Sequence, residues 1–177
     1  MKTRKTALAF ILMAVLAITA NAQQYNPESD FQIDWDPNVK DGVIITKYIG
    51  TKKEVRIPPS IQNYPVTSIG KEAFLENRNI TSVIIPNSVT SIRAGGAFAV
   101  CTNLTSVTIP NKVTTIESFA FQSCTSLTSV TFQGTIASGR FSNNNTFPGD
   151  LRDKYLADDG GPGTYRRFSN GEIWRKQ

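Results

Sequence analysis

An internal repeat constrains the fold of this 177-residue chain more than any other feature of its sequence. The stretch from Leu104 to Cys124, LTSVTIPNKVTTIESFAFQSC, closely matches the stretch from Ile80 to Cys101, ITSVIIPNSVTSIRAGGAFAVC. A valine that marks each unit recurs at spacings of 28, 24 and 23 residues, at Val55, Val83, Val107 and Val130. A fixed period in this range is typical of stacked repeats, in which insertions are confined to loops.

Each unit predicts one short strand and a return segment. The stretch SVTIP alternates like a strand, with Val107 and Ile109 facing inward and Thr108 facing outward. Pro110 ends the strand because proline has no backbone N–H to donate. The stretch around SFAFQSC is expected to return as a turn and a short helical or irregular piece.

A single unit does not bury enough apolar surface to fold alone. Burying its seven apolar side chains contributes about 1.5–3 kcal/mol each. Ordering some 23 residues costs roughly 1.5 kcal/mol per residue. Stacking supplies the missing contacts between neighbours. We therefore predict an α/β repeat solenoid of about 3.5 units at residues 51–141, with a strand and an irregular or short helical return in each unit.

The first 22 residues have the pattern of a secretory signal peptide. A basic start precedes an apolar run from Ala7 to Ala17, and an Ala-x-Ala cleavage site follows at residues 20–22. An uncleaved anchor is the alternative interpretation, although the run is short for a span of roughly 20 residues. Cleavage would leave 16 Lys and Arg against 14 Asp and Glu, which lowers the formal net charge from +5 to +2. We expect an exported protein with no nucleic-acid partner and, after cleavage, no stable membrane anchor.

The residues before the repeats, 23–50, are expected to cover one end of the stack, since an open end exposes apolar side chains and strand edges. The stretch GVIITKYIG predicts an extra strand. Phe31, Ile33 and Trp35 are expected to add apolar cover. The same region is acidic, whereas the far end of the chain is basic.

The last segment, residues 142–177, is expected to cover the other end. DLRDKYLA predicts a short helix with Asp150 at its N-cap. GTYRRFSNGEIWRKQ predicts a hairpin that turns at Asn170-Gly171. Tyr165 and Trp174 on this hairpin are interpreted as cover for the core, with ligand contact as the alternative.

The pattern LTSVTIPNxVTxIxxxAFxxCTxL resembles the leucine-rich repeats of the BspA type, which occur in secreted and surface proteins of host-associated anaerobic bacteria. The resemblance is specific from Ile80 to Val130, interrupted from Glu54 to Asn79, and weak after Phe132. It covers roughly residues 42–168 when the lead-in strand and the tail are included. It implies a secreted, periplasmic or outer-surface protein that binds other proteins, with adhesion to host or neighbouring-cell proteins as one role.

Histidine is absent, which excludes Ser-His-Asp and Cys-His catalysis and His-ligated metal. Cys101 and Cys124 occupy the same column of adjacent units. They are interpreted as small buried hydrophobes, as is routine in the family that the chain resembles, with a disulfide as the alternative. No CxxC motif or third ligand supports a metal or redox site.

Two acidic stretches invite a functional interpretation. Asp34 to Asp41 places oxygens at alternate positions, but an EF-hand loop would need glycine and glutamate where Val39 and Ile45 stand. The pair Asp158-Asp159 beside GGPG is more simply a solvated turn than a general acid and base. We predict no catalytic residue, no metal and no cofactor, so the chain is not expected to be an enzyme.

The outward strand positions form the candidate binding surface. Its residues are Tyr48, Arg56, Ser82, Ile84, Ser106, Thr108 and Thr131. Such a face commonly holds partners in leucine-rich repeats, although a Thr/Ser ladder is equally well explained as solvent cover that suits a strand. Tyr48, Arg56 and Ile84 are the preferred contacts because they break the pattern.

We expect binding to a protein, such as an extracellular-matrix or envelope protein. The alternative is a structural component of the cell envelope without a diffusible ligand. Clustered apolar exposure on the strand face would favour binding, and a uniformly polar face would favour the structural role.

Overall fold

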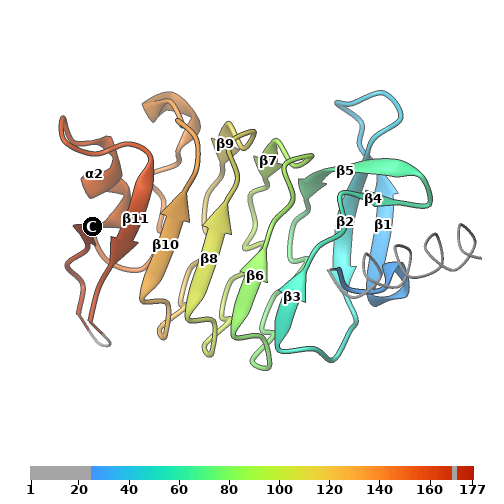
Figure 1. Cartoon of the computed structure of the whole chain (residues 1–177), viewed down its shortest axis with the longest axis horizontal. Coiled ribbons are helices and arrows are strands. Elements are labelled where there is room, and N and C mark those ends of the chain that lie inside the picture. The colour runs from blue at the N-terminus through green and yellow to red at the C-terminus, as the bar shows by residue number, and fades with distance from the viewer. Residues whose placement is uncertain (1–24, 169–170) are drawn as a thin grey trace, which may run out of the picture.

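The chain coils into a β-solenoid of about four turns, built from two largely parallel sheets (Figure 1). The computed structural model describes residues 25–168 and 171–177. The predicted signal peptide at 1–22 and Asn170 of the predicted hairpin turn lie outside these residues. Within the described part of the chain, no helix is long and apolar enough to cross a membrane.

The strands predicted from the repeat form what we call the main sheet. Four of them are parallel: β3 (Glu54–Arg56), β6 (Ser82–Ile84), β8 (Ser106–Ile109) and β10 (Ser129–Phe132). Two antiparallel strands extend it, β11 (Gly163–Arg166) and β12 (Arg175–Lys176). The marker valines lie in register across the parallel strands and all are buried, because the alternation turns every second side chain inward.

A second sheet, which the sequence did not predict, lies on the return side of each turn. It has the order β1 (Phe31–Trp35), β2 (Val43–Tyr48), β5 (Tyr64–Ile69), β7 (Ser91–Ile92) and β9 (Thr115–Ile116). The short strand β4 (Ser60–Ile61) pairs with β5. The predicted strand in GVIITKYIG is therefore present as β2, but it belongs to this sheet and pairs with β5.

Each return was expected to be helical or irregular, and the irregular form is the one observed. The stretch SFAFQSC consists mostly of turns, and its residues Phe119 and Ser123 have φ of 64° and 58°. A left-handed residue interrupts a right-handed helix, so apolar residues three and four apart do not become a helix here. Among the described residues, the α-helix is α2 (Leu151–Leu156), and the 3-10 helices are η1 (Glu28–Asp30) and η2 (Ser138–Arg140).

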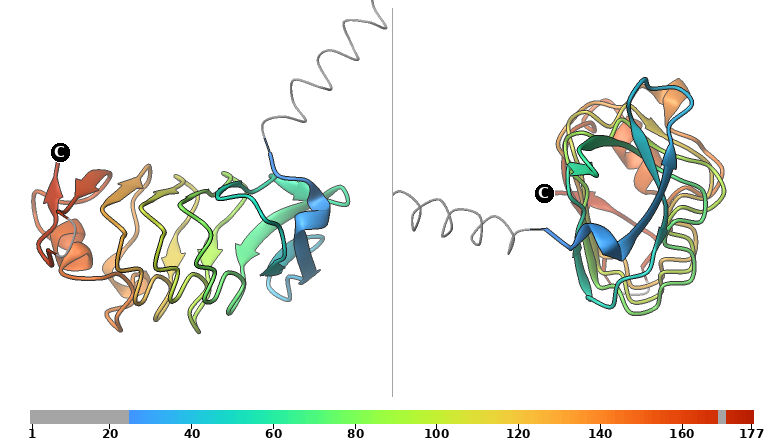
Figure 2. Two further views of the ribbon diagram at one scale, coloured as in Figure 1. Left: turned by 90° about the horizontal axis from the view of Figure 1, so that it is seen from below. Right: turned by 90° about the vertical axis from the view of Figure 1, so that its right-hand side faces the viewer.

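Aromatic rings form a continuous stack along the core, which we call the ring stack. Consecutive centroids lie 5.3, 4.6, 4.8 and 4.6 Å apart, with interplanar angles of 20° or less. Its members are Tyr48, Phe74, Phe98, Phe121 and Phe147. The end-on view in Figure 2 shows why the rings meet, since successive turns nearly superpose and equivalent residues fall in columns.

The two cysteines form a second buried column beside the ring stack. Both thiols are free, so the disulfide alternative is not realised in this structure. Cys101 Sγ donates to the carbonyl oxygen of Phe74 at 3.0 Å, and Cys124 Sγ donates to that of Phe98 at 3.1 Å. Hydrogen bonding with Cys101, together with burial, raises the pKa of the Cys124 thiol. These thiols act as buried hydrophobes that make weak hydrogen bonds.

At the N-terminal end, β1 and β2 pair as an antiparallel hairpin. Phe31 is buried and Ile33 is partly buried, but Trp35 is 58% exposed and packs edge-on against Tyr64. The prediction that Trp35 covers the core is therefore wrong, because it stands at the end of β1, where the hairpin leaves the stack.

The loop after β1 is tied to the repeats by a buried carboxylate, Asp36. Its Oδ2 accepts hydrogen bonds from the hydroxyls of Thr67 and Ser68, both at 2.7 Å, and its Oδ1 accepts from Arg93 Nη2 at 2.7 Å. Burial alone would raise the pKa of Asp36. Hydrogen bonds from the Asn38 N–H and the two hydroxyls, together with the Arg93 charge, hold that pKa below its usual value.

At the C-terminal end, the predicted short helix is present as α2, but Asp150 does not cap it with its side chain. The Asp150 carboxylate instead accepts the backbone N–H of Trp174 at 2.7 Å. The indole N–H of Trp174 donates to the Pro148 carbonyl at 2.8 Å. Tyr165 and Trp174 are both fully buried, which agrees with their interpretation as core residues.

Candidate protein-interaction surface

The outward side chains of the main sheet form two rows, which together we call the outer face. Strand pairing places one row at Glu54, Ser82, Ser106, Ser129, Arg166 and Arg175. It places the other at Arg56, Ile84, Thr108, Thr131 and Thr164. The sheet is nearly regular, so neighbouring members of a row stand one strand apart.

Six of the seven predicted contact residues lie on this face. Arg56 is exposed, Ile84 is 43% exposed, and the four hydroxyl residues are half-buried. Those four are Ser82, Ser106, Thr108 and Thr131.

Tyr48 was placed on this face wrongly. It belongs to β2 of the second sheet, and its ring ends the ring stack inside the core. Its hydroxyl accepts a hydrogen bond from Asn26 Nδ2 at 3.2 Å and donates to the Lys52 carbonyl at 3.3 Å. Burial, followed by the negative charge of Asp30, raises the pKa of this phenol. The side chain is therefore a structural residue.

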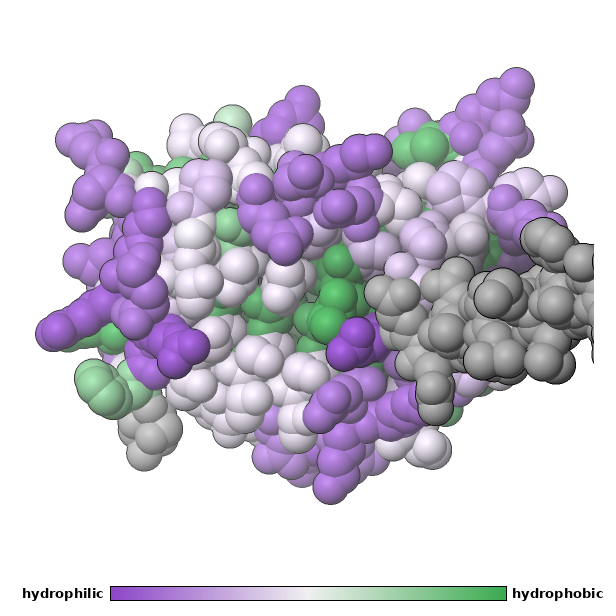
Figure 3. Space-filling view, in the orientation of Figure 1, coloured by the Kyte–Doolittle hydropathy of each residue, from purple (hydrophilic) through white to green (hydrophobic). Residues whose placement is uncertain are grey.

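The middle of the outer face is mostly weakly polar, with one apolar break. Figure 3 shows a small hydrophobic patch bordered mostly by pale, weakly polar surface and on one side by a strongly hydrophilic residue, with further hydrophilic residues above, below and at the end that carries β11 and β12. Ile84 is the exposed large hydrophobic residue of the two rows, and Arg56 stands directly opposite it on β3. The face is thus neither uniformly polar nor broadly apolar.

A groove opens where the outer face meets the C-terminal strands. It has a volume of about 710 Å³. Its lining includes Ser106, Ser129, Arg166, Phe168 and Arg175. The sequence did not predict this groove. The tail is visibly basic, but its composition does not show which strand of the sheet the arginines join.

Two adjacent arginines at this groove have different roles. The guanidinium of Arg167 donates to the carbonyl oxygens of Leu127 at 2.6 Å and Thr125 at 2.9 Å, and also to that of Gly171. It also lies 5.4 Å from the centroid of the Trp174 ring. Burial lowers the pKa of Arg167. This side chain anchors the C-terminal segment to the fourth turn.

Arg166 and Arg175 are exposed and face each other across β11 and β12. Within the described ranges, neither guanidinium has a hydrogen-bond partner or a carboxylate within 4.0 Å. Like charges directly opposite on neighbouring strands repel. Both side chains are therefore available to an anionic group from outside.

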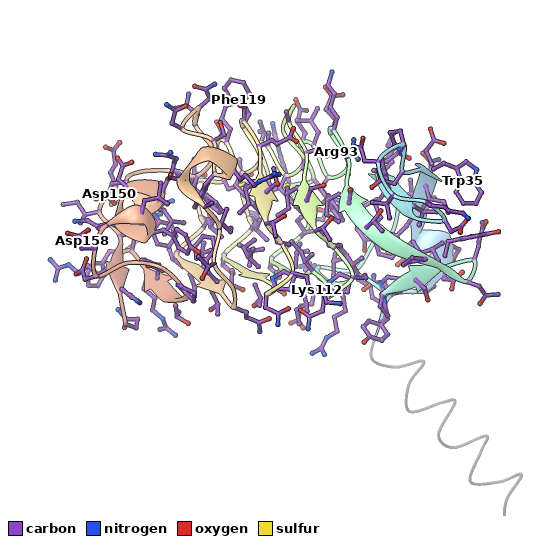
Figure 4. All side chains as sticks on the ribbon, turned by 90° about the horizontal axis from the view of Figure 1, so that it is seen from above. Trp35, Arg93, Lys112, Phe119, Asp150 and Asp158 are labelled. Atoms are coloured by element: carbon purple, nitrogen blue, oxygen red, sulfur yellow. The ribbon has the colours of Figure 1, made fainter. Side chains whose placement is uncertain are left out.

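The acidic stretches have structural surroundings. Asp36 is paired with Arg93, and Asp158 lies at the opposite end of the molecule from Trp35 (Figure 4). Asp158 and Asp159 are exposed, and the Asp159 carbonyl accepts from Lys176 Nζ at 3.3 Å. In the part of the chain that the structure describes, no group of three or more His, Cys, Asp or Glu side chains is arranged to hold a metal ion.

Stacked turns, a strand on the main sheet in each turn and a core of aliphatic and aromatic columns define a bacterial-type leucine-rich repeat β-solenoid. The model of the BspA type leucine rich repeat region matches residues 53–147 in 6 copies. The chain belongs to this family.

Solved structures support the assignment. A leucine rich repeat protein of Treponema pallidum is 32% identical with a TM-score of 0.60, and the match covers 63% of this chain and 51% of that one. A leucine-rich repeat protein of Bacteroides capillosus is 28% identical with a TM-score of 0.58, covering 68% and 88%. A leucine rich cell surface protein of Faecalibacterium prausnitzii is 33% identical with a TM-score of 0.50, covering 61% and 31%. No curated protein matches the chain. This chain thus spans about half of the Treponema protein and a third of the Faecalibacterium protein.

Proposed function

We propose that this chain is an exported, non-enzymatic protein that binds another protein on its outer face. The observation that carries the proposal is the open main sheet, where Ile84 and Arg56 stand together among half-buried hydroxyl residues. An exposed apolar side chain beside an arginine is the composition of an interface centre. Membership of a repeat family that uses extended strand surfaces for partners supports the same function.

The proposed location is the cell surface or the extracellular space, after removal of residues 1–22. The sequence pattern of that segment supports export. The Faecalibacterium neighbour is a cell surface protein, which supports the same compartment. We propose an extracellular-matrix or envelope protein as partner, with adhesion to host or neighbouring cells as the biological consequence.

The ends of the solenoid are proposed to act as caps, at residues 23–50 and 142–177. The β1–β2 hairpin adds strands to one end of the second sheet, while α2, β11 and β12 lie at the other end of the molecule (Figure 1). These elements pack large side chains against the outermost turns, including Phe31 and Trp174. Covered ends keep a short solenoid from adding further copies edge to edge.

A second candidate function is a structural component of the cell envelope. The observation that favours it is the serine and threonine content of the two rows, which gives much of the outer face a polar, β-compatible surface. A polar face of this kind is stable in contact with water without a bound partner.

A capture experiment separates the two functions. Residues 23–177, which contain every residue of the described fold, are immobilised and exposed to extracellular-matrix and envelope protein extracts. A variant carrying Arg56→Glu, Ile84→Glu and Thr108→Glu is tested beside the parent, and circular dichroism checks that it is folded. Loss of one specific, identified partner in the folded variant supports binding at the outer face. Equal capture by both proteins rejects the Arg56, Ile84 and Thr108 part of the face as the contact site, and no specific capture rejects binding in favour of the structural role.

A further inference from the structure

We propose that the groove at the C-terminal end of the outer face recognises an acidic, partly apolar segment of a protein partner. Arg166 and Arg175 would bind its carboxylates, and Phe168 and Ile173 would contact its apolar side chains. The inference rests on the proposed function, because the groove continues the outer face, and it specifies the chemistry of the partner at one place.

The position of the arginines in the sheet is the first reason. The register Ser106, Ser129, Arg166, Arg175 places two guanidinium groups at the end of a row of small hydroxyl residues on the same face. The two arginines oppose each other on adjacent strands. Bringing like charges together is unfavourable for the isolated fold. An anion that bridges both groups removes that repulsion.

No Asp or Glu side chain lines the groove, and the nearest acidic influence is that of Glu172 on the neighbouring Arg167. All of its lining residues are basic, polar and neutral, or apolar. The hydroxyls of Ser106 and Ser129 have no hydrogen-bond partner among the described residues and are half-buried. In contrast, the neighbouring hydroxyls of Thr105 and Thr128 donate to backbone carbonyls of the preceding turn. The serines thus supply free donors in the same row as the two arginines.

Exposed apolar side chains at the rim select the kind of anion. Phe168 is 86% exposed and Ile173 is 64% exposed, and both line the groove. Exposed hydrophobic side chains that gather at a groove mark a contact site. A sulfated polysaccharide would use the arginines but not these side chains. A peptide that alternates carboxylate and apolar residues would use both, since arginine pairs carboxylates bidentately.

The size of the groove predicts a modest affinity for an isolated segment. A volume of about 710 Å³ accommodates a short peptide stretch and not a folded domain. Contacts along the rest of the outer face would then add to the affinity for a whole partner protein.

The test uses a fluorescein-labelled peptide that alternates glutamate and leucine, with fluorescence anisotropy as the readout. A matched peptide with glutamine in place of glutamate is the ligand control. Variants of residues 23–177 are Arg166→Glu/Arg175→Glu, the milder Arg166→Gln/Arg175→Gln, and the control Arg78→Glu/Arg140→Glu. The control reverses two exposed arginines that do not line the groove.

We expect the parent to bind the acidic peptide, and the groove variants to bind at least about tenfold more weakly. The Arg78→Glu/Arg140→Glu control should keep the parent affinity within about twofold. Equal weakening by the control means that only net charge matters, and it overturns the inference. Failure of the parent to prefer the acidic over the glutamine peptide also overturns it, as does the absence of any peptide binding at low salt.

The result is separable from the proposed function. If an identified partner is captured by the parent and by the folded Arg166→Glu/Arg175→Glu variant, but not by the Arg56, Ile84 and Thr108 variant, the groove inference fails and outer-face binding stands. If the groove variant alone loses that partner, the groove carries the recognition, and the central part of the face does not.

Discussion

The central turns and the C-terminal strands use the same sheet for different purposes. In β6, β8 and β10 one outward row carries serine at every strand, whereas in β11 and β12 the same row carries Arg166 and Arg175. The repeated positions are set by what stacks well on an identical neighbour. The positions outside the repeat are free of that constraint. Charged side chains can therefore occupy this row in β11 and β12, where the repeat has ended.

The two regions also differ in how they are held together. The central turns share the ring stack and the cysteine column, in which each residue meets its equivalent in the next turn. The C-terminal segment is held by single contacts that have no equivalent elsewhere, such as Arg167 over Trp174. A lost contact in the centre therefore affects two neighbouring turns, and a lost contact at the end affects one.

The largest effect is expected from removing a ring at the centre of the stack. Phe98 is fully buried between Phe74 and Phe121, at 4.6 and 4.8 Å. Phe98→Ala should lower the free energy of unfolding by about 3–5 kcal/mol in urea denaturation. The matched control is Phe119→Ala, because Phe119 is 38% exposed and lies on a neighbouring turn of the return side.

Phe119→Ala should lower the free energy of unfolding by less than about 1 kcal/mol. If Phe98→Ala and Phe119→Ala cost the same, the stack is not a principal stabilising element of the central turns.

The N-terminal end offers the next largest effect. Asp36→Asn removes the charge that holds Arg93, at a site where the Asp36 side chain is fully buried and that of Arg93 is 24% exposed. The free energy of unfolding at about pH 7 should fall by about 2–4 kcal/mol.

The pH dependence of this variant supplies its own check. The pKa of Asp36 is lowered in the fold, so its contribution is fully present above the unfolded value near pH 4 and is lost as pH falls through the folded value. The parent should therefore lose stability below about pH 4, and the difference between parent and variant should shrink by about pH 3. A difference that stays constant across this range would contradict the role of the Asp36 charge.

Most of the fold followed from the sequence because the repeat fixes equivalent positions. Val83, Val107 and Val130 predicted both the strands and their register. The second sheet was missed because β7 and β9 are two residues long, too short for an alternating pattern to be recognised. The sequence left the return open as helical or irregular, and left-handed backbone at Phe119 and Ser123 prevents a helix there.

The positions of the candidate binding surface were predicted where the repeat continues, and the groove was missed where the repeat stops. Arg56, Ile84 and Thr108 were placed correctly on the outer face by alternation alone. Tyr48 was placed wrongly because nothing local in the lead-in segment distinguishes a strand of the main sheet from one of the second sheet. The groove depends on the antiparallel pairing of β10 with β11, a long-range contact that the basic composition of the tail does not encode.

A smaller effect should separate the adjacent arginines at the C-terminal end. Arg167→Ala removes three donors to backbone carbonyls and the contact with Trp174, and should cost about 1–3 kcal/mol. Arg166→Ala, which removes an exposed side chain, should change the free energy of unfolding by less than about 0.5 kcal/mol.

Hydrogen exchange shows which part of the molecule loses stability in Arg167→Ala. For Arg167→Ala, protection should fall in β11 and β12 and stay unchanged in β6 and β8. Increased exchange throughout the central turns would show that the end and the centre unfold as one unit, which would remove the distinction drawn between them.

The smallest effect is a gain in stability. Arg175→Ser places the residue type of the central row opposite Arg166 and removes the cross-strand repulsion. The free energy of unfolding should rise by about 0.2–0.5 kcal/mol at low salt. The gain should largely disappear at about 1 M salt, where exposed charges are screened over roughly 3 Å. A gain that persists at high salt would reflect strand propensity instead of charge. A salt-dependent gain would mean that the unliganded fold carries the arginine pair at a cost to its own stability, as expected of residues kept for a partner.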